Sequence, residues 1–224
     1  MVARQSAFTR AQQDYLKALY NLHGDLQLVP TRDLAHKLGV SSPSVSEMVT
    51  RLTAQGLVEH DRNRGQQLTH EGRKVALELV RHHRLLEMFL VQVLGYSWDE
   101  VHEEAERMEH VISERMEERI FELLGRPELD PHGHAIPSLK GKVRLVSERP
   151  LSECRVGEKV VVQGVSDDDP IRLRELERRG LLPGTRIEIV EESKFEGLIE
   201  VRIKGRRVSV PLGLARAMFV EGVS

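Results

Sequence analysis

Residues 31–55, TRDLAHKLGVSSPSVSEMVTRLTAQ, carry the clearest structural signal in the N-terminal part of the chain. The first eight of these residues place apolar side chains at helical spacing, and Gly39 follows where a left-handed helix stop is expected. Pro43 occupies a first-turn position of the next helix, whose apolar side chains again share one face. The pattern predicts two short helices joined by a tight turn.

The flanking residues extend these two helices into a larger unit. Residues 8–23 have helical periodicity, with Thr9 as a candidate N-cap. Residues 57–72 alternate around a polar tip, Asp61–Gly65, as a two-stranded hairpin does. A long helix begins after the hairpin. This order of elements is that of a winged helix-turn-helix.

The Ser-rich helix of this unit has a polar outer face. Its short hydroxyls fit the major groove of DNA, which is about 12 Å wide. The arginines at the hairpin tip are expected against phosphates or in the minor groove. The alternative is a three-helix packing module with a surface hairpin. The candidate DNA-binding residues are Ser41, Ser42, Pro43, Ser44, Ser46, Glu47, Arg51, Arg62 and Arg64.

The composition is that of a globular protein. The 224 residues carry a net charge of −2, with 40% hydrophobic and 30% charged residues. The single cysteine, Cys154, excludes an internal disulfide and a thiolate metal cluster. The apolar runs are too short to span a membrane, and MVARQSAFTR lacks the apolar core of a secretion signal. We therefore expect a cytoplasmic protein with no membrane partner.

The middle of the chain is acidic and rich in histidine. Residues 81–140 hold 13 of the 35 Asp and Glu residues and six of the ten histidines. A long helix expected over residues 99–124 carries Glu106, Glu109 and His110 at i, i+3 and i+4, so the three project from one face. Carboxylates with one imidazole and no sulfur suit Mn(II), with Fe(II), Co(II) and Zn(II) as competitors.

A second set of metal-ligand types lies on the preceding helix, where His83 and Glu87 stand at i and i+4. If the two long helices pack antiparallel, these residues can converge with His102 on a second metal site. The alternative reading of both sets is a solvated acidic helix face, on which histidines pair with neighbouring glutamates.

The last third of the chain has a different pattern. Short β-rich runs broken by Gly and Pro begin at residue 151 and predict a small barrel. The expected fold is mainly α with a small β domain. The predicted divisions are a winged helix at 1–75, a helical metal-binding and dimerisation domain at 76–140, a linker at 141–150 and an SH3-like domain at 151–224.

Several motifs together resemble the diphtheria toxin repressor (DtxR/MntR) family of metal-dependent bacterial transcription factors. They are DYLKALY, SSPSVSEMVTRL, RHHRLLEMFL, VHEEAERMEHVISERME and DPHGHAIP. Residues 151–224 resemble the SH3-like, FeoA-type domain of the three-domain branch. The resemblance implies an N-terminal winged helix, a helical dimerisation domain and a C-terminal barrel.

The resemblance also implies which residues bind metal. The primary site of the family corresponds to Asp14, Glu106, Glu109 and His110. Iron-responsive members have methionine in place of Asp14 and cysteine in place of Glu106, so the two carboxylates here imply Mn(II). Members with a close two-metal cluster have glutamate where Lys17 stands, which argues against such a cluster in this chain.

The secondary site of the family corresponds to His83, Glu87 and His102. The DPHGHAIP motif implies His132 as a further ligand, with Asp130 as another candidate. The C-terminal domain of the family lends one acidic ligand, for which we select Asp169 in the Asp167–Asp169 run.

The expected function is that of a manganese-dependent repressor of metal-uptake genes, acting as a homodimer on palindromic double-stranded operator DNA. Without metal, carboxylates at the primary site should repel one another and free the first helix. Mn(II) should then lock the operator-binding geometry, with Fe(II) as the alternative metal. A winged-helix regulator of a small organic ligand is a further alternative. No HExxH motif, nucleophile elbow or phosphate-binding Gly loop supports an enzyme.

Overall fold

The structure is a computed structural model that describes residues 8–167, 169–193 and 197–223. These residues form two compact units, which are described separately. The first contains residues of Met1–His83, Arg107–Glu118 and Pro137–Lys142, and the second contains residues of Arg84–Glu106, Arg119–Ile136 and Val143–Ser224. No described helix is both long enough and apolar enough to cross a membrane.

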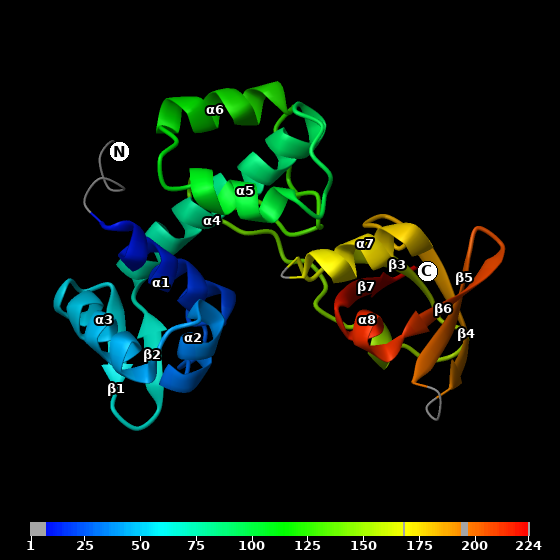
Figure 1. The fold of residues 1–224 in the computed structure, drawn as a ribbon, viewed down its shortest axis with the longest axis horizontal. Coiled ribbons are helices and arrows are strands. Elements are labelled where there is room, and N and C mark those ends of the chain that lie inside the picture. Colours follow the sequence, from blue (N-terminus) through cyan, green and yellow to red (C-terminus); the bar gives the residue numbers. More distant parts are fainter. Residues whose placement is uncertain (1–7, 168, 194–196, 224) are drawn as a thin grey trace. The chain divides into compact units, whose positions relative to one another are not determined.

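The N-terminal part of the first unit is a winged helix-turn-helix, as predicted (Figure 1). Thr9 caps the first helix in a reciprocal capping box with Gln12, and Gly39 ends the second helix at φ 64°. The elements are α1 (Arg10–Asn21), α2 (Thr31–Leu38), α3 (Ser42–Ala54), β1 (Val58–Asp61) and β2 (Gly65–Leu68).

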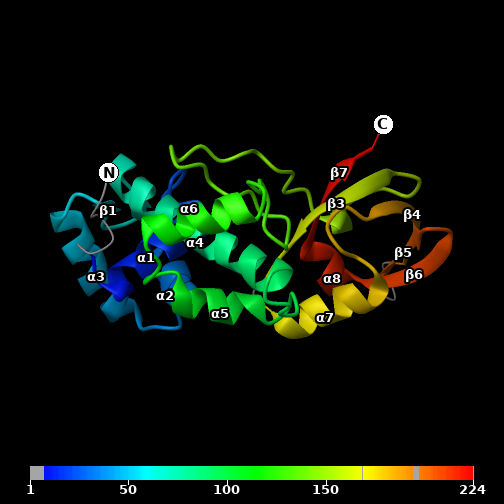
Figure 2. The ribbon, with the colours of Figure 1, turned by 90° about the horizontal axis from the view of Figure 1, so that it is seen from above.

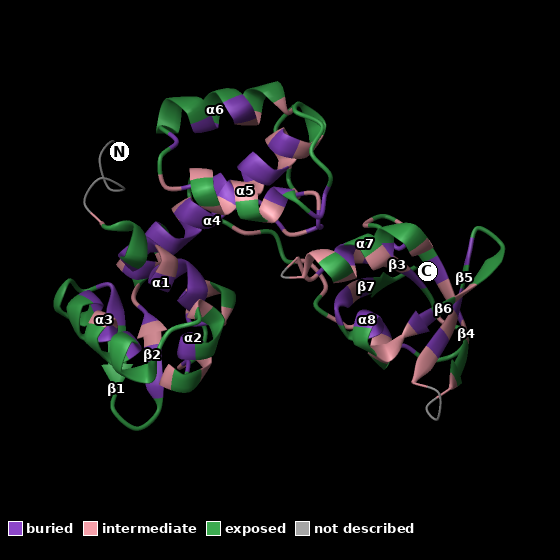
Figure 3. Cartoon of the chain, viewed as in Figure 1, coloured by how far each residue is buried: buried purple, intermediate pink, exposed green. Residues whose placement is uncertain are grey.

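One hydrophobic core holds α1, α2 and α3 together. Leu16 of α1, Leu34 of α2 and Leu52 of α3 are each fully buried in it. Figure 3 shows the buried residues on the inner sides of these helices and exposed residues along the outer side of α3. The position of α3 is therefore fixed by packing against α1 and α2, while its outer face stays accessible.

Gly65 attaches the hairpin to the helices. Its φ is 117°, and a Cβ at this position would lie 2.1 Å from the carbonyl oxygen of Val29. Only glycine permits this approach. It allows Gln66 to exchange two backbone hydrogen bonds with Val29, at 2.8 and 3.0 Å. The wing is thus anchored to the segment that precedes α2.

The middle of the chain forms three helices, α4 (His70–Gln92), α5 (Val101–Met108) and α6 (Glu114–Leu123). The prediction of one helix over residues 99–124 is wrong, because the chain turns after Met108. Ser113 then caps α6, its hydroxyl accepting from the Met116 N–H at 3.2 Å. Glu109 and His110 consequently lie in a turn.

The C-terminal part is the expected small β domain, an antiparallel five-stranded sheet in the order β6-β5-β4-β3-β7. Its strands curve around an apolar core that includes Val162, Ile189 and Val201 (Figure 2). The elements are β3 (Lys159–Val165), α7 (Pro170–Arg179), β4 (Arg186–Ser193), β5 (Leu198–Ile203), β6 (Arg206–Pro211), α8 (Leu212–Arg216) and β7 (Met218–Gly222), preceded by a 3-10 turn, Leu151–Glu153.

Candidate metal centres and nucleic-acid interface

The helix α3 presents a row of hydroxyl groups to solvent. Ser41 is its N-cap and accepts a hydrogen bond from the Ser44 N–H at 3.3 Å. Ser42, Pro43, Ser44 and Ser46 are all exposed, and Ser46 donates to the Ser42 carbonyl at 3.0 Å. The first turn of α3 is therefore an accessible polar surface of the kind that lies in a major groove.

Glu47 and Arg51, both predicted to contact DNA, form an ion pair one turn apart on α3. Their side chains are 68% and 62% exposed. The carboxylate thus neutralises the only arginine of this helix at the surface expected to meet phosphates. Such an exposed pair contributes little stability, so DNA phosphate can replace the carboxylate as the partner of Arg51.

The tip of the hairpin is shaped by Asp61. Its Oδ1 accepts from the Asn63 and Arg64 N–H groups at 2.8 and 3.0 Å. These two hydrogen bonds lower the pKa of Asp61. The tight turn leaves the predicted phosphate-contacting residues Arg62 and Arg64 exposed.

A first group of metal-ligand types lies within the first unit. His110 Nε2 is 2.9 Å from Asp14 Oδ1 of α1 and 3.5 Å from Glu109 Oε1. The Glu109 side chain is fully buried, and the His110 side chain is 6% exposed. His110 Nδ1 lies 2.6 Å from Gln13 Oε1, a contact that orients the ring. The structure thus brings together three of the four residues predicted for the primary site.

The fourth predicted residue, Glu106, is half-buried on α5, one turn before Glu109. Its carboxylate lies 3.8 Å from His102 Nε2 on the same helix. The assignment of Glu106 to the primary site stays a prediction.

Lys17 reaches the same cluster, and sequence reasoning did not assign it a contact there. Its Nζ lies 2.7 and 2.9 Å from the two oxygens of Glu109 and 3.1 Å from His83 Nδ1. His83 Nδ1 is itself 2.5 Å from Glu109 Oε2. Part of the repulsion expected among the carboxylates is therefore offset, because the Lys17 ammonium group contacts Glu109.

A buried network next to this cluster also went unrecognised in the sequence. Glu117 of α6 forms an ion pair with Arg81, and its Oε2 is 3.0 Å from His82 Nε2. Burial would raise the pKa of Glu117, but His82 and Arg81 together lower it. His82 Nδ1 lies 3.2 Å from the Glu109 carbonyl, so the network supports the backbone of a candidate ligand.

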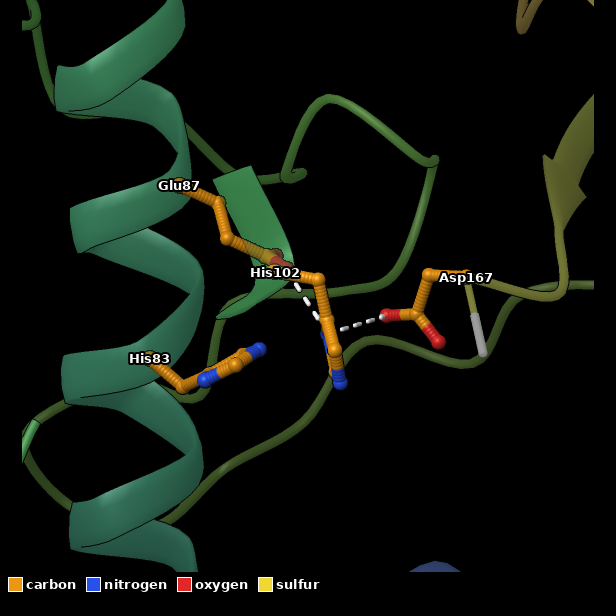
Figure 4. A group of neighbouring side chains, drawn as sticks. All are labelled: His83, Glu87, His102 and Asp167. Atoms are coloured by element: carbon orange, nitrogen blue, oxygen red, sulfur yellow. Dashed lines mark hydrogen bonds and ion pairs between the residues drawn. The ribbon is translucent and has the colours of Figure 1, made fainter. Parts of the chain in front are cut away.

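A second group lies within the second unit. His102 Nδ1 is 3.3 Å from Glu87 Oε1 of α4 and 3.7 Å from Asp167 Oδ2 (Figure 4). His83 precedes Glu87 by one turn of the same helix, as the i, i+4 spacing predicted. Glu87 is fully buried, whereas the His102 side chain is 31% exposed, so α4 and α5 bring a buried carboxylate and a partly accessible imidazole together.

The other oxygen of Glu87 faces the DPHGHAIP segment. Glu87, Asp130 and His132 form a fully buried set of donors whose ligand atoms all lie within 4.8 Å of one another. The Asp130 Oδ1 accepts from the His132 and His134 N–H groups at 2.9 Å each, which folds the segment back on itself. Two residues predicted from this motif are thus adjacent to Glu87.

His132 is oriented for ligation through one particular nitrogen. Its Nε2 is 2.8 Å from the Trp98 carbonyl oxygen, whereas its buried Nδ1 makes no hydrogen bond. That nitrogen lies 3.7 Å from Glu87 Oε2. Burial would lower the pKa of His132, but the carboxylates of Glu87, Asp130 and Asp167 raise it to about 9. A buried imidazole nitrogen directed at carboxylates fits a divalent cation.

Gly133 allows the DPHGHAIP segment to approach the β domain within the second unit. Its φ is 92°, and a Cβ there would lie 2.0 Å from the Gln163 carbonyl oxygen. The close approach permits Val165 N–H of β3 to donate to the His132 carbonyl at 2.9 Å. The glycine of this motif therefore positions the histidine beside it.

A C-terminal acid in the second group is Asp167, and the assignment of Asp169 stays a prediction. Asp169 caps α7, its Oδ1 accepting from the Ile171 and Arg172 N–H groups at 2.9 and 3.2 Å. An aspartate directly before proline and a helix is a favoured N-cap. Asp168 lies outside the described residues.

Three family models match the chain. The model "Iron dependent repressor, N-terminal DNA binding domain" matches residues 7–66, and "Iron dependent repressor, metal binding and dimerisation domain" matches residues 69–138. The FeoA domain model matches residues 149–222.

Similar proteins are found along nearly the whole chain. The iron-dependent repressor IdeR of Mycobacterium leprae (strain TN) is 34% identical, over 93% of this chain and 96% of its own length. A solved manganese-dependent transcriptional repressor in complex with manganese is 41% identical, with TM-score 0.88, over 95% of this chain and all of its own. The manganese regulator SloR is 32% identical, with TM-score 0.77, over 95% and 98%.

Proposed function

Because the chain belongs to the family of iron-dependent repressors, whose members include the diphtheria toxin repressor, we propose that it is a Mn(II)-dependent repressor of transcription. The family consists of DNA-binding repressors and not of enzymes. The observation that carries the choice of metal is the donor set of Asp14, Glu109 and His110, with two carboxylates and one imidazole. Hard oxygen donors of this kind suit Mn(II), whereas thiolate and thioether donors select softer metals.

The proposed coupling runs through α1. A divalent ion at the primary site supplies positive charge for the carboxylates around it. Asp14 would bind the ion from α1, and the core contacts of α1 fix the position of α3. Glu109 and His110 would bind the same ion from the turn after α5. Metal and DNA would each favour the same arrangement, and a coupling of about 1–3 kcal/mol is typical of such linkage.

We assign the second group to a further ion. The donors proposed for it within the second unit are Glu87, His102, Asp130, His132 and Asp167. His83 is a further candidate from its one-turn spacing to Glu87 in the sequence. Support comes from the buried Nδ1 of His132, which makes no hydrogen bond, and from the short distances between the carboxylates and imidazoles of the second unit.

The proposed target is a palindromic operator bound by a homodimer in the cytoplasm. Two copies of α3 would then lie about one helical turn, ~34 Å, apart on the DNA. The genes controlled are those of metal uptake, which a repressor should silence when the metal is plentiful.

The test is operator binding by fluorescence anisotropy, with and without Mn(II). Asp14→Ala and Glu106→Ala should each abolish the metal dependence and leave the far-ultraviolet circular dichroism unchanged. Glu122→Ala, at an acid of α6 that is 51% exposed, is the control and should respond as the wild type does. A normal response of either site variant to Mn(II) would contradict the assignment of the primary site.

Iron is the second candidate metal, because the relatives at 34% identity are named iron-dependent. The same assay under anaerobic conditions with Fe(II) separates the two. Activation at lower free Fe(II) than Mn(II) would favour the iron-responsive alternative.

A further inference from the structure

Lys17 is a buried lysine among candidate metal ligands. It lies on α1 three residues after Asp14, so both side chains leave the helix on the same face. Only 7% of the residue is exposed. Lysine is almost never buried to this degree unless its charge is paired.

The pairing is specific and runs through Glu109. The ammonium group contacts both carboxylate oxygens, at 2.7 and 2.9 Å, and the Glu109 side chain is fully buried. His83 Nδ1 lies at 3.1 Å on the same ammonium group. Glu109 therefore binds the Lys17 ammonium group through the same two oxygens that would bind a metal ion.

The two roles of Glu109 conflict. The carboxylate also lies 3.5 Å from His110 Nε2, inside the donor set of Asp14, Glu109 and His110. A divalent ion held by that set must share Glu109 with the Lys17 ammonium group a few ångströms away. Two positive charges at such a separation in a buried site repel strongly.

We propose that Lys17 sets the metal affinity of the primary site by competing with the divalent ion for Glu109. This inference rests on the proposed function. The fixed charge weakens metal binding, so the regulator responds only when free metal is abundant. Lys17 is thus a residue that determines the sensor's threshold, with no direct bond to the ion.

If Lys17 only positioned Glu109, removing its charge would change the metal affinity in the opposite direction. In that case the ammonium group holds the carboxylate where the metal needs it, and its removal lowers metal affinity. The sign of the change in affinity therefore separates competition from positioning.

The experiment is calorimetric titration of the full chain with Mn(II). Lys17→Met, which keeps the length and removes the charge, should bind at the primary site at least about tenfold more tightly than the wild type. Lys17→Arg should bind within a few-fold of the wild type. Lys37→Met, at an exposed lysine of α2, is the matched control and should leave the affinity unchanged.

Binding at the second group is followed separately through the fluorescence of Trp98. This residue is the only tryptophan of the chain and stacks on His132 with ring centroids 5.4 Å apart. This signal separates a change of affinity at the primary site from one that reaches the second group through His83, which Lys17 also contacts at 3.1 Å.

Unchanged or weaker binding by Lys17→Met at the primary site would overturn the proposal, even if the wild type binds Mn(II) and responds normally. Failure of the wild type to bind Mn(II) would overturn the proposed function as well. If Lys17→Met and Lys17→Gln fold only with Mn(II) present, competition is supported, since the ion then replaces the ammonium charge. If neither folds even with Mn(II), the proposal is overturned.

Discussion

His132 and Trp98 are joined twice. The imidazole Nε2 lies 2.8 Å from the Trp98 carbonyl oxygen, and the two rings stack at 26° with centroids 5.4 Å apart. A carbonyl oxygen can only accept, so Nε2 donates to it, and Nδ1 is the nitrogen that a metal ion can bind in place of a proton. The indole therefore lies against the ring of a candidate metal ligand.

This contact predicts an optical signal for the second group. Mn(II) binding at His132 Nδ1 should change the emission of Trp98, because the cation withdraws electron density from the stacked imidazole. His132→Gln should lose the change, whereas His36→Gln, at an exposed histidine of α2, should keep it. Retention of the full signal in His132→Gln would exclude His132 as a ligand.

Substitutions of Asp167 and Asp169 should affect different properties, metal binding in the first case and stability in the second. Asp167→Ala should weaken binding at the second group by about tenfold, through the loss of one ligand and its charge. Asp169→Ala should leave that affinity unchanged and cost about 1 kcal/mol, through the loss of the α7 N-cap. Trp98 fluorescence titration and thermal unfolding measure the two effects. The reverse pattern would restore Asp169 as the ligand.

Glu47→Gln should strengthen binding to any DNA duplex. The substitution removes the carboxylate charge that pairs with Arg51 on α3. The Arg51 guanidinium can then contact one more DNA phosphate. The slope of log K against log salt should steepen by about 1. Glu71→Gln, which breaks the comparable exposed pair with Lys74, is the control and should leave the slope unchanged. An unaltered slope in Glu47→Gln would place Arg51 away from the phosphates.

Glu117→Gln should be destabilised by about 3 kcal/mol near neutral pH, because it removes the charge of the carboxylate that pairs with the buried Arg81. The pKa of Glu117 is lowered from its ordinary value of 4.5 in the folded chain. The stability it provides is therefore present in full above pH 4.5 and lost as the pH falls through the lowered pKa. The gap between wild type and variant in urea unfolding should shrink over that acidic range. A gap independent of pH would show that the charge is not responsible.

Much of the winged helix could be predicted from the sequence, because its signals are local. Gly39, Pro43 and the polar tip at residues 61–65 act on their own neighbours, and each marks an element boundary in the structure. The contact between Glu87 and His102 could also be predicted, because antiparallel packing of the two helices brings these positions together.

The remaining features depend on contacts between distant residues. Lys17 and Glu109 are 92 positions apart, and nothing local marks them as partners. The break between α5 and α6 was missed because the helical periodicity continues through it. Asp167 lies beside His102 whereas Asp169 caps α7, and only the proline after Asp169 marks that difference in the sequence.

The turn after α5 has a further consequence for how the protein can evolve. In an uninterrupted helix, the regular backbone would fix the directions of the Glu109 and His110 side chains relative to Glu106. Outside a regular helix, small changes in the backbone of this turn can alter the directions of Glu109 and His110 without disturbing the packing of α5 and α6.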